Sequence, residues 1–184
     1  MNIDRQALDN ITALLKNEQT RSEAFSRLVR LMSKPLYWHI RKMVLNHDDA
    51  DDLLQNTFMK AWSALADFRG DSQIHTWLFR IATNETLTFL ASQRMKNITS
   101  SLEMEEVLLS NIQGDPYFNG DEVQKRLQEA ILSLPEKQRL VFNMKYYENL
   151  SYYDMEKILN TSVGALKASY HHAVKKIENF FTED

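Results

Sequence analysis

Apolar residues recur every three or four positions along most of this chain, and this spacing predicts amphipathic helices. The first predicted helix carries an apolar stripe from Ala7 to Leu15, with Asp4 as its N-cap. A second stripe begins at Ala24 and is expected to end at Pro35, and a third follows from Leu36. We interpret these stripes as core faces and assign no chemistry to them.

The fourth predicted helix begins in an acidic stretch, where Asp48 or Asp49 is expected to be the N-cap. Its buried stripe is expected to consist of Ala50, Leu53, Leu54, Phe58, Ala61, Trp62 and Leu65. Its outward face is expected to carry Asp51, Asp52, Gln55, Asn56, Met59 and Lys60. Periodicity alone favours a solvated helix with a stabilising acidic N-terminus. A metal or acid–base site is disfavoured because no His or Glu stands at ligand spacing beside the carboxylates.

The segment from Phe68 to Ser72 breaks the helical pattern. Asp71 or Ser72 is expected to cap a further helix, whose apolar residues run from Ile74 to Leu90 and include Trp77. A loop that presents Phe and Arg beside a Trp favours stacking of unpaired bases, which contributes about 1–3 kcal/mol per base.

Residues 97–122 carry Ser, Asn, Gly and Pro at positions that interrupt any period, and this composition predicts an acidic linker with room for one short helix. Beyond it, helices are expected from Val123, from Pro135, and from two N-caps at Ser151 and Ser162. The short turn at Asn160 between the last two is typical of a helix-turn-helix. The outward face of the last helix carries Lys167, Ala168, His171, His172 and Lys175.

Composition supports an all-α protein made of two small helical domains, since the 184 residues include only four Gly and three Pro. The absence of Cys excludes disulfides and thiolate catalysis and is compatible with the cytoplasm. No export signal or apolar membrane span is recognised, so no direct membrane insertion is expected. We expect no enzyme and no cofactor, because no nucleophile–base pair, metal cluster or phosphate loop is found.

The net charge of −3 is unevenly distributed along the chain. Lys and Arg number 13 against 11 Asp and Glu in residues 1–98, none against 6 in residues 99–122, and 9 against 8 in residues 123–184. Two nearly neutral blocks therefore flank an acidic joint. This distribution permits DNA binding but argues against strong unaided binding to duplex, because phosphate neutralisation supplies most non-specific affinity.

The adjacent residues His171 and His172 could suggest a zinc site. This is disfavoured, because neighbouring side chains on a helix point apart and no second pair is spaced to complete the site. On a recognition helix they donate hydrogen bonds to base edges or phosphates instead. We expect no metal.

Two sequence blocks, DDADDLLQNTFMKAW and FRGDSQIHTWLFRIATN, resemble in order and spacing region two of the extracytoplasmic-function (ECF) type of bacterial sigma factor. Such factors are the dissociable subunits that give RNA polymerase its promoter specificity. The resemblance implies that core RNA polymerase binds Asp51, Asp52, Gln55 and Asn56. It implies that the melted minus-ten element is bound by Phe68, Arg69, Asp71, Ser72, Trp77, Arg80 and Asn84.

A third block, LPEKQRLVFNMKYYENLSYYDMEKILNTSVGALKASYHHAVKKI, resembles region four of the same family. The resemblance implies that the minus-thirty-five duplex is bound by Ser151, Tyr152, Lys167, Ala168, His171, His172 and Lys175. Ser169, His172 and Val174 stand where the family commonly has Arg, so only modest duplex affinity is expected.

The resemblance implies a region two domain over residues 1–96, a linker over 97–122 and a region four domain over 123–184. The implied partners are core RNA polymerase, promoter DNA and an anti-sigma factor, in the cytoplasm. Two alternatives stay open. One is a sigma-mimicking decoy that binds an anti-sigma protein, and the other is a stand-alone helix-turn-helix regulator.

Overall fold

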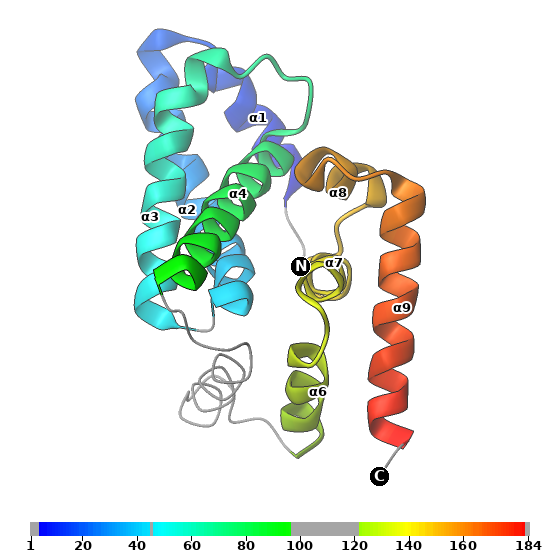
Figure 1. Ribbon diagram of the computed structural model, residues 1–184. Helices are drawn as coiled ribbons and strands as arrows, with labels where there is room; N and C mark the ends of the chain where they lie inside the picture. Colours follow the sequence, from blue (N-terminus) through cyan, green and yellow to red (C-terminus); the bar gives the residue numbers. More distant parts are fainter. Residues whose placement is uncertain (1–3, 45, 97–121, 183–184) are drawn as a thin grey trace. The chain divides into compact units, whose positions relative to one another are not determined.

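A computed structural model describes residues 4–44, 46–96 and 122–182 of the chain (Figure 1). Its elements are α1 (Arg5–Leu15), α2 (Glu18–Val44), α3 (His47–Ala64), the 3-10 helix η1 (Leu65–Asp67), α4 (Ile74–Lys96), α6 (Glu122–Leu132), α7 (Glu136–Tyr146), α8 (Tyr152–Leu159) and α9 (Val163–Thr182). These ranges contain no strand, which confirms the all-α class. The predicted linker falls on residues 97–121, which lie outside the described ranges, and on Glu122, the first residue of α6.

The helices form two compact units, one built around α1–α4 and the other around α6–α9. In the first unit, Asp4 accepts a hydrogen bond of 3.0 Å from the amide of Ala7, which confirms it as the N-cap of α1. The predicted break at Pro35 is wrong, because α2 continues through this residue. Met32 and Leu36, which flank the proline, are fully buried on the same side of the helix. Continuous burial of that stripe offsets the one backbone hydrogen bond that proline cannot donate.

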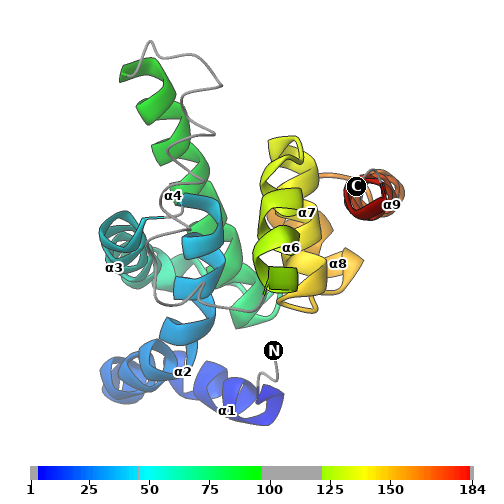
Figure 2. The same ribbon diagram turned by 90° about the horizontal axis from the view of Figure 1, so that it is seen from below.

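Helices α1–α4 of the first unit are drawn in Figures 1 and 2, and polar contacts join them in addition to apolar packing. The buried imidazole of His39 on α2 lies 2.9 Å from the Thr83 hydroxyl on α4 and meets the Phe79 ring edge to face. An ion pair between Lys60 and Glu85 joins α3 to α4. Helix α4 is therefore tied to α2 by one polar contact and to α3 by another.

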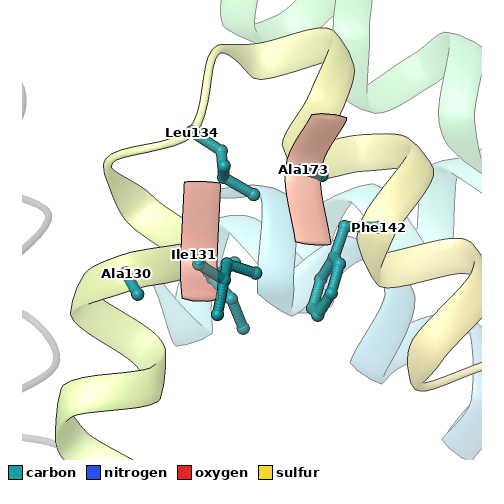
Figure 3. Close-up of a cluster of buried hydrophobic side chains, with 6 residues drawn as sticks. Ala130, Ile131, Leu134, Phe142 and Ala173 are labelled. Carbon is teal, nitrogen blue, oxygen red and sulfur yellow. The ribbon is translucent and has the colours of Figure 1, made fainter. Parts of the chain in front are cut away.

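The core of the second unit collects residues from three helices and one turn. In Figure 3 the side chains of Ile131, Leu134 and Phe142 converge near Ala173 of α9. Phe142 also stacks on Tyr170, with ring centroids 5.8 Å apart and planes inclined by 15°. This packing holds α9 against α6 and α7, and it leaves the opposite side of α9 in solvent.

Candidate functional site

The acidic end of α3 is capped by a residue that the sequence analysis did not select. The Asn46 side chain accepts hydrogen bonds from the amides of Asp48 and Asp49, at 2.8 Å and 3.4 Å. The expected cap at Asp48 or Asp49 is therefore wrong, and both residues occupy the first helical turn instead. There they still complement the positive end of the helix dipole.

Four residues predicted to bind polymerase lie on the exposed side of α3, and we call them the acidic docking face: Asp51, Asp52, Gln55 and Asn56. Two large apolar side chains continue this face along the helix, Met59 at 61% and Trp62 at 46% exposure. The prediction that Trp62 is buried is wrong. Its ring packs against the ring of Phe25, with the two centroids 4.9 Å apart, and this contact covers only part of the indole. Trp62 stands seven residues, about two helical turns, after Gln55, and this spacing could have placed it on the same exposed face.

Carboxylates are crowded at this end of α3, and one of them, Asp51, lies beside an imidazole. Burial, followed by the negative charges of Asp52 and Asp48, raises the pKa of the Asp49 carboxyl. The Asp51 carboxylate lies 3.5 Å from Nε2 of His47. The other ring nitrogen of His47 lies 2.7 Å from the Tyr37 hydroxyl of α2. A cationic partner surface would therefore meet a cluster of carboxylates whose mutual repulsion it relieves.

Seven further predicted residues lie in the loop before α4 and along the first half of α4, and we call them the base-capture surface: Phe68, Arg69, Asp71, Ser72, Trp77, Arg80 and Asn84. Gly70 permits the turn because its φ of +82° lies in the left-handed region. The turn brings Phe68 beside Trp77. The centroids of the two rings lie 5.0 Å apart, and the ring planes are inclined by 47°. Both rings are partly exposed, so each keeps surface on which another ring can stack.

The polar residues of this surface come from the first half of α4 and from the loop before it. Arg80 and Asn84 are exposed and stand one helical turn apart, so they share one side of α4. Arg69 and Asp71 are exposed in the loop, whereas Ser72 is partly covered. The surface thus combines an aromatic platform with cations and an amide, the groups that hold a single strand by stacking and backbone attraction.

Helices α8 and α9 form a helix-turn-helix around Asn160, whose φ of +49° confirms the predicted left-handed turn. The predicted caps are also confirmed. The Ser151 hydroxyl accepts from the amide of Asp154 at 3.1 Å and donates to the Asp154 carboxylate at 2.5 Å. Ser162 accepts from the amide of Ala165 at 3.4 Å. The Ser151 hydroxyl is thus engaged in its own helix.

The outward side of α9 is exposed at each predicted position, and we call these residues the recognition face: Lys167, Ala168, His171, His172 and Lys175. Tyr152 of α8 stands beside it, and burial, followed by Tyr170, raises the pKa of the Tyr152 phenol. The ammonium groups of Lys167 and Lys145 lie 5.8 Å and 5.2 Å from the Tyr152 ring centroid. Helical periodicity does not indicate Lys145, because only the fold brings the end of α7 to this ring.

Within the described residues, no group of three or more His, Asp or Glu is arranged to hold a metal ion. No helix described by the structure is long and apolar enough to cross a membrane.

Comparison with known families yields two matches. The family described as Sigma-70 region 2 matches residues 28–95, and the family described as Sigma-70, region 4 matches residues 124–177. These matches together include every residue of the acidic docking face, the base-capture surface and the recognition face.

The chain is 31% identical to the ECF RNA polymerase sigma factor SigW of Bacillus subtilis over 160 residues, 81% of this chain and 84% of that one. It is 29% identical to the RNA polymerase sigma-H factor of Pseudomonas aeruginosa over 163 residues, 84% of either chain. Among solved structures, the sigma factor RpoE of Bartonella quintana, in complex with the anti-sigma factor NepR, has a similar fold. Its TM-score is 0.68 at 22% identity, over 87% of this chain and 98% of that one.

Proposed function

Because this chain belongs to the ECF group of the sigma-70 family, and so is a factor that directs promoter-specific transcription, we propose a division of labour among its surfaces. The acidic docking face binds the core polymerase, the base-capture surface holds the unpaired minus-ten strand, and the recognition face binds the minus-thirty-five duplex. We assign these tasks to a domain over residues 1–96, a linker over 97–122 and a domain over 123–184. The factor acts in the cytoplasm.

The observation that carries this proposal is the partly exposed aromatic pair of Phe68 and Trp77 beside Arg69, Arg80 and Asn84. Extracting a base from the duplex costs a few kcal/mol, and a pocket with aromatic stacking offsets that cost. Packing of a hydrophobic core alone does not explain why Phe68 and Trp77 stay partly in solvent beside two arginines. The arrangement supports capture of a base that the polymerase helps to unpair.

Docking on polymerase is supported by the exposed carboxylates of α3 and by the apolar side chains of Met59 and Trp62 that extend them. We add these two residues to the docking surface, since buried aromatic side chains often dominate the energy of protein interfaces. For the second unit we add Lys145, held with Lys167 on the Tyr152 ring, as a contact to duplex phosphates.

The experiment that tests this function is reconstitution. Purified chain and bacterial core polymerase are incubated with a library of promoter fragments, and initiated transcripts are sequenced. The expected result is core binding and initiation from a selected class of promoters. A chain that neither binds core nor directs initiation would overturn the proposal. Binding of an anti-sigma protein without binding of core would favour a decoy instead.

A further inference from the structure

Helix α4, which we propose faces unpaired DNA, carries one acidic residue within its 23 positions, Glu85. Glu85 directly follows Asn84, a member of the base-capture surface. A carboxylate at this position repels a phosphodiester backbone over distances shorter than the Debye length, about 8 Å at physiological ionic strength. An acid here opposes the proposed task of the helix unless another group neutralises it.

Lys60 of α3 supplies that neutralising charge. Its ammonium nitrogen lies 2.5 Å from Oε1 of Glu85. The Glu85 side chain is only 17% exposed, whereas that of Lys60 is 61% exposed, so the cation lies on the solvent side of the pair. Removing the cation would leave a largely covered carboxylate without compensation, which is the costly way to break such a pair.

We propose that Lys60 is a charge-masking residue, which pairs with Glu85 so that this carboxylate presents no uncompensated negative charge to the unpaired minus-ten strand beside Asn84. This inference rests on the proposed function of α4 and adds a residue of the neighbouring helix to it. A pair that only held α3 against α4 would also suffer more from loss of Lys60, which leaves the covered Glu85 carboxylate unpaired, but that loss would appear in thermal unfolding and not specifically in DNA binding. Charge masking predicts in addition that loss of Lys60 weakens binding of unpaired DNA in a salt-dependent way, and that removing Glu85 restores this binding.

The test compares Lys60→Gln, Glu85→Gln and the double variant with wild type, each assembled with core polymerase. Open-complex formation on a selected promoter and binding of an unpaired minus-ten oligonucleotide are measured, together with core affinity. Lys60→Gln is expected to weaken oligonucleotide binding about fivefold at low salt and less than about twofold at high salt, because salt screens the repulsion. Glu85→Gln and the double variant are expected to match or exceed wild type. Lys34→Gln, at an exposed lysine of α2, is the matched control.

Equal losses in both single variants, or a double variant as weak as Lys60→Gln, would overturn charge masking. A defect of Lys60→Gln that appears in core affinity and is not restored by Glu85→Gln would overturn it as well. Thermal unfolding of each variant identifies losses caused by misfolding, and the double variant then still decides, since it lacks the ion pair and the repelling charge. Failure of the proposed function itself is recognised separately, by a wild-type protein that forms no open complex.

Discussion

The aromatic pair of Phe68 and Trp77 is held by contacts that leave part of each ring in solvent. A captured base gains by stacking on a ring whose position is already fixed, because little conformational entropy is lost on binding. Phe68 fixes Trp77 from one side, and the first turn of α4 fixes its backbone through a hydrogen bond to Gln73. The pair is therefore arranged before DNA arrives.

Trp77→Ala should reduce open-complex formation about tenfold, since a stacked base contributes about 1–3 kcal/mol. Trp77→Phe retains a ring that Phe68 can still contact and should lose much less. Permanganate reactivity of unpaired thymines in the minus-ten element measures the effect, with core affinity as the control. Equal defects in Trp77→Ala and Trp77→Phe would show that the ring is not a stacking platform.

Tyr152 holds Lys145 and Lys167 through its ring face and not through its hydroxyl. Tyr152→Phe should therefore keep minus-thirty-five affinity within about twofold. Tyr152→Ala removes the ring under both ammonium groups, although Lys145 keeps its hydrogen bond of 3.2 Å to the Leu150 carbonyl, and should lower the affinity more strongly. Binding of the reconstituted holoenzyme to duplex fragments, measured across a salt series, separates the two variants. If Tyr152→Phe were as weak as Tyr152→Ala, the hydroxyl and not the ring would be the important group.

At the level of elements, the helix-turn-helix depends on a backbone conformation that few residues adopt at low cost. Asn160 has φ of +49°, where Ala is disfavoured by roughly 1–2 kcal/mol and Gly is not. Asn160→Ala should lower the free energy of unfolding by about 1 kcal/mol, and Asn160→Gly should lower it less or raise it. Urea denaturation followed by circular dichroism measures both variants. A neutral Asn160→Ala would mean that the turn rearranges.

Helices α3 and α4 present two surfaces that should separate in function. Asp52→Lys places a cation within the acidic docking face and should abolish core binding, because it converts attraction for a basic partner into repulsion. Asn84→Ala should leave core binding unchanged and impair open-complex formation. Core affinity and promoter melting are measured for each variant after folding is checked. Equal loss of core binding in both folded variants would contradict the proposal that α3 and α4 carry separate functions.

The sequence was most informative where one local interaction determines the outcome. Caps at Asp4 and Ser151 and the left-handed Asn160 follow from the hydrogen bonds and φ values that these side chains favour. Prediction failed where burial overrode a local rule. Pro35 was read as a stop, although buried side chains on both sides keep α2 continuous. The prediction for Trp62 failed for a different reason, because its apolar character favours burial although part of its ring remains exposed.

Contacts between distant segments could not be predicted from helical periodicity at all. The pairing of Lys60 with Glu85 and the gathering of Lys145 beside Tyr152 depend on which helices pack together. Periodicity assigns each of these side chains to a face of its own helix and says nothing of the helix opposite. The roles of the candidate site residues remain predictions, which the variants proposed above are designed to test.

At the level of the whole molecule, the charge distribution requires a division of work between factor and polymerase. The net charge is −3, and α9, which carries the proposed recognition face, contains no Arg. A protein with few cations near DNA releases few counterions, so its duplex affinity is low and depends weakly on salt. Specificity in such a chain is useful only when another protein supplies the affinity.

The free chain should therefore bind minus-thirty-five duplex no more tightly than the non-specific range of about 10⁻⁴–10⁻⁶ M at physiological salt, and binding should become specific once core polymerase is present. Fluorescence anisotropy with a labelled duplex, with and without core, measures both states, and a scrambled duplex is the control. Tight, sequence-specific binding by the free chain would favour a stand-alone helix-turn-helix regulator. Because the acidic docking face lies on the first unit and the recognition face on the second, Asp52→Lys should remove the gain in affinity that core provides while leaving the weak binding of the free chain unchanged.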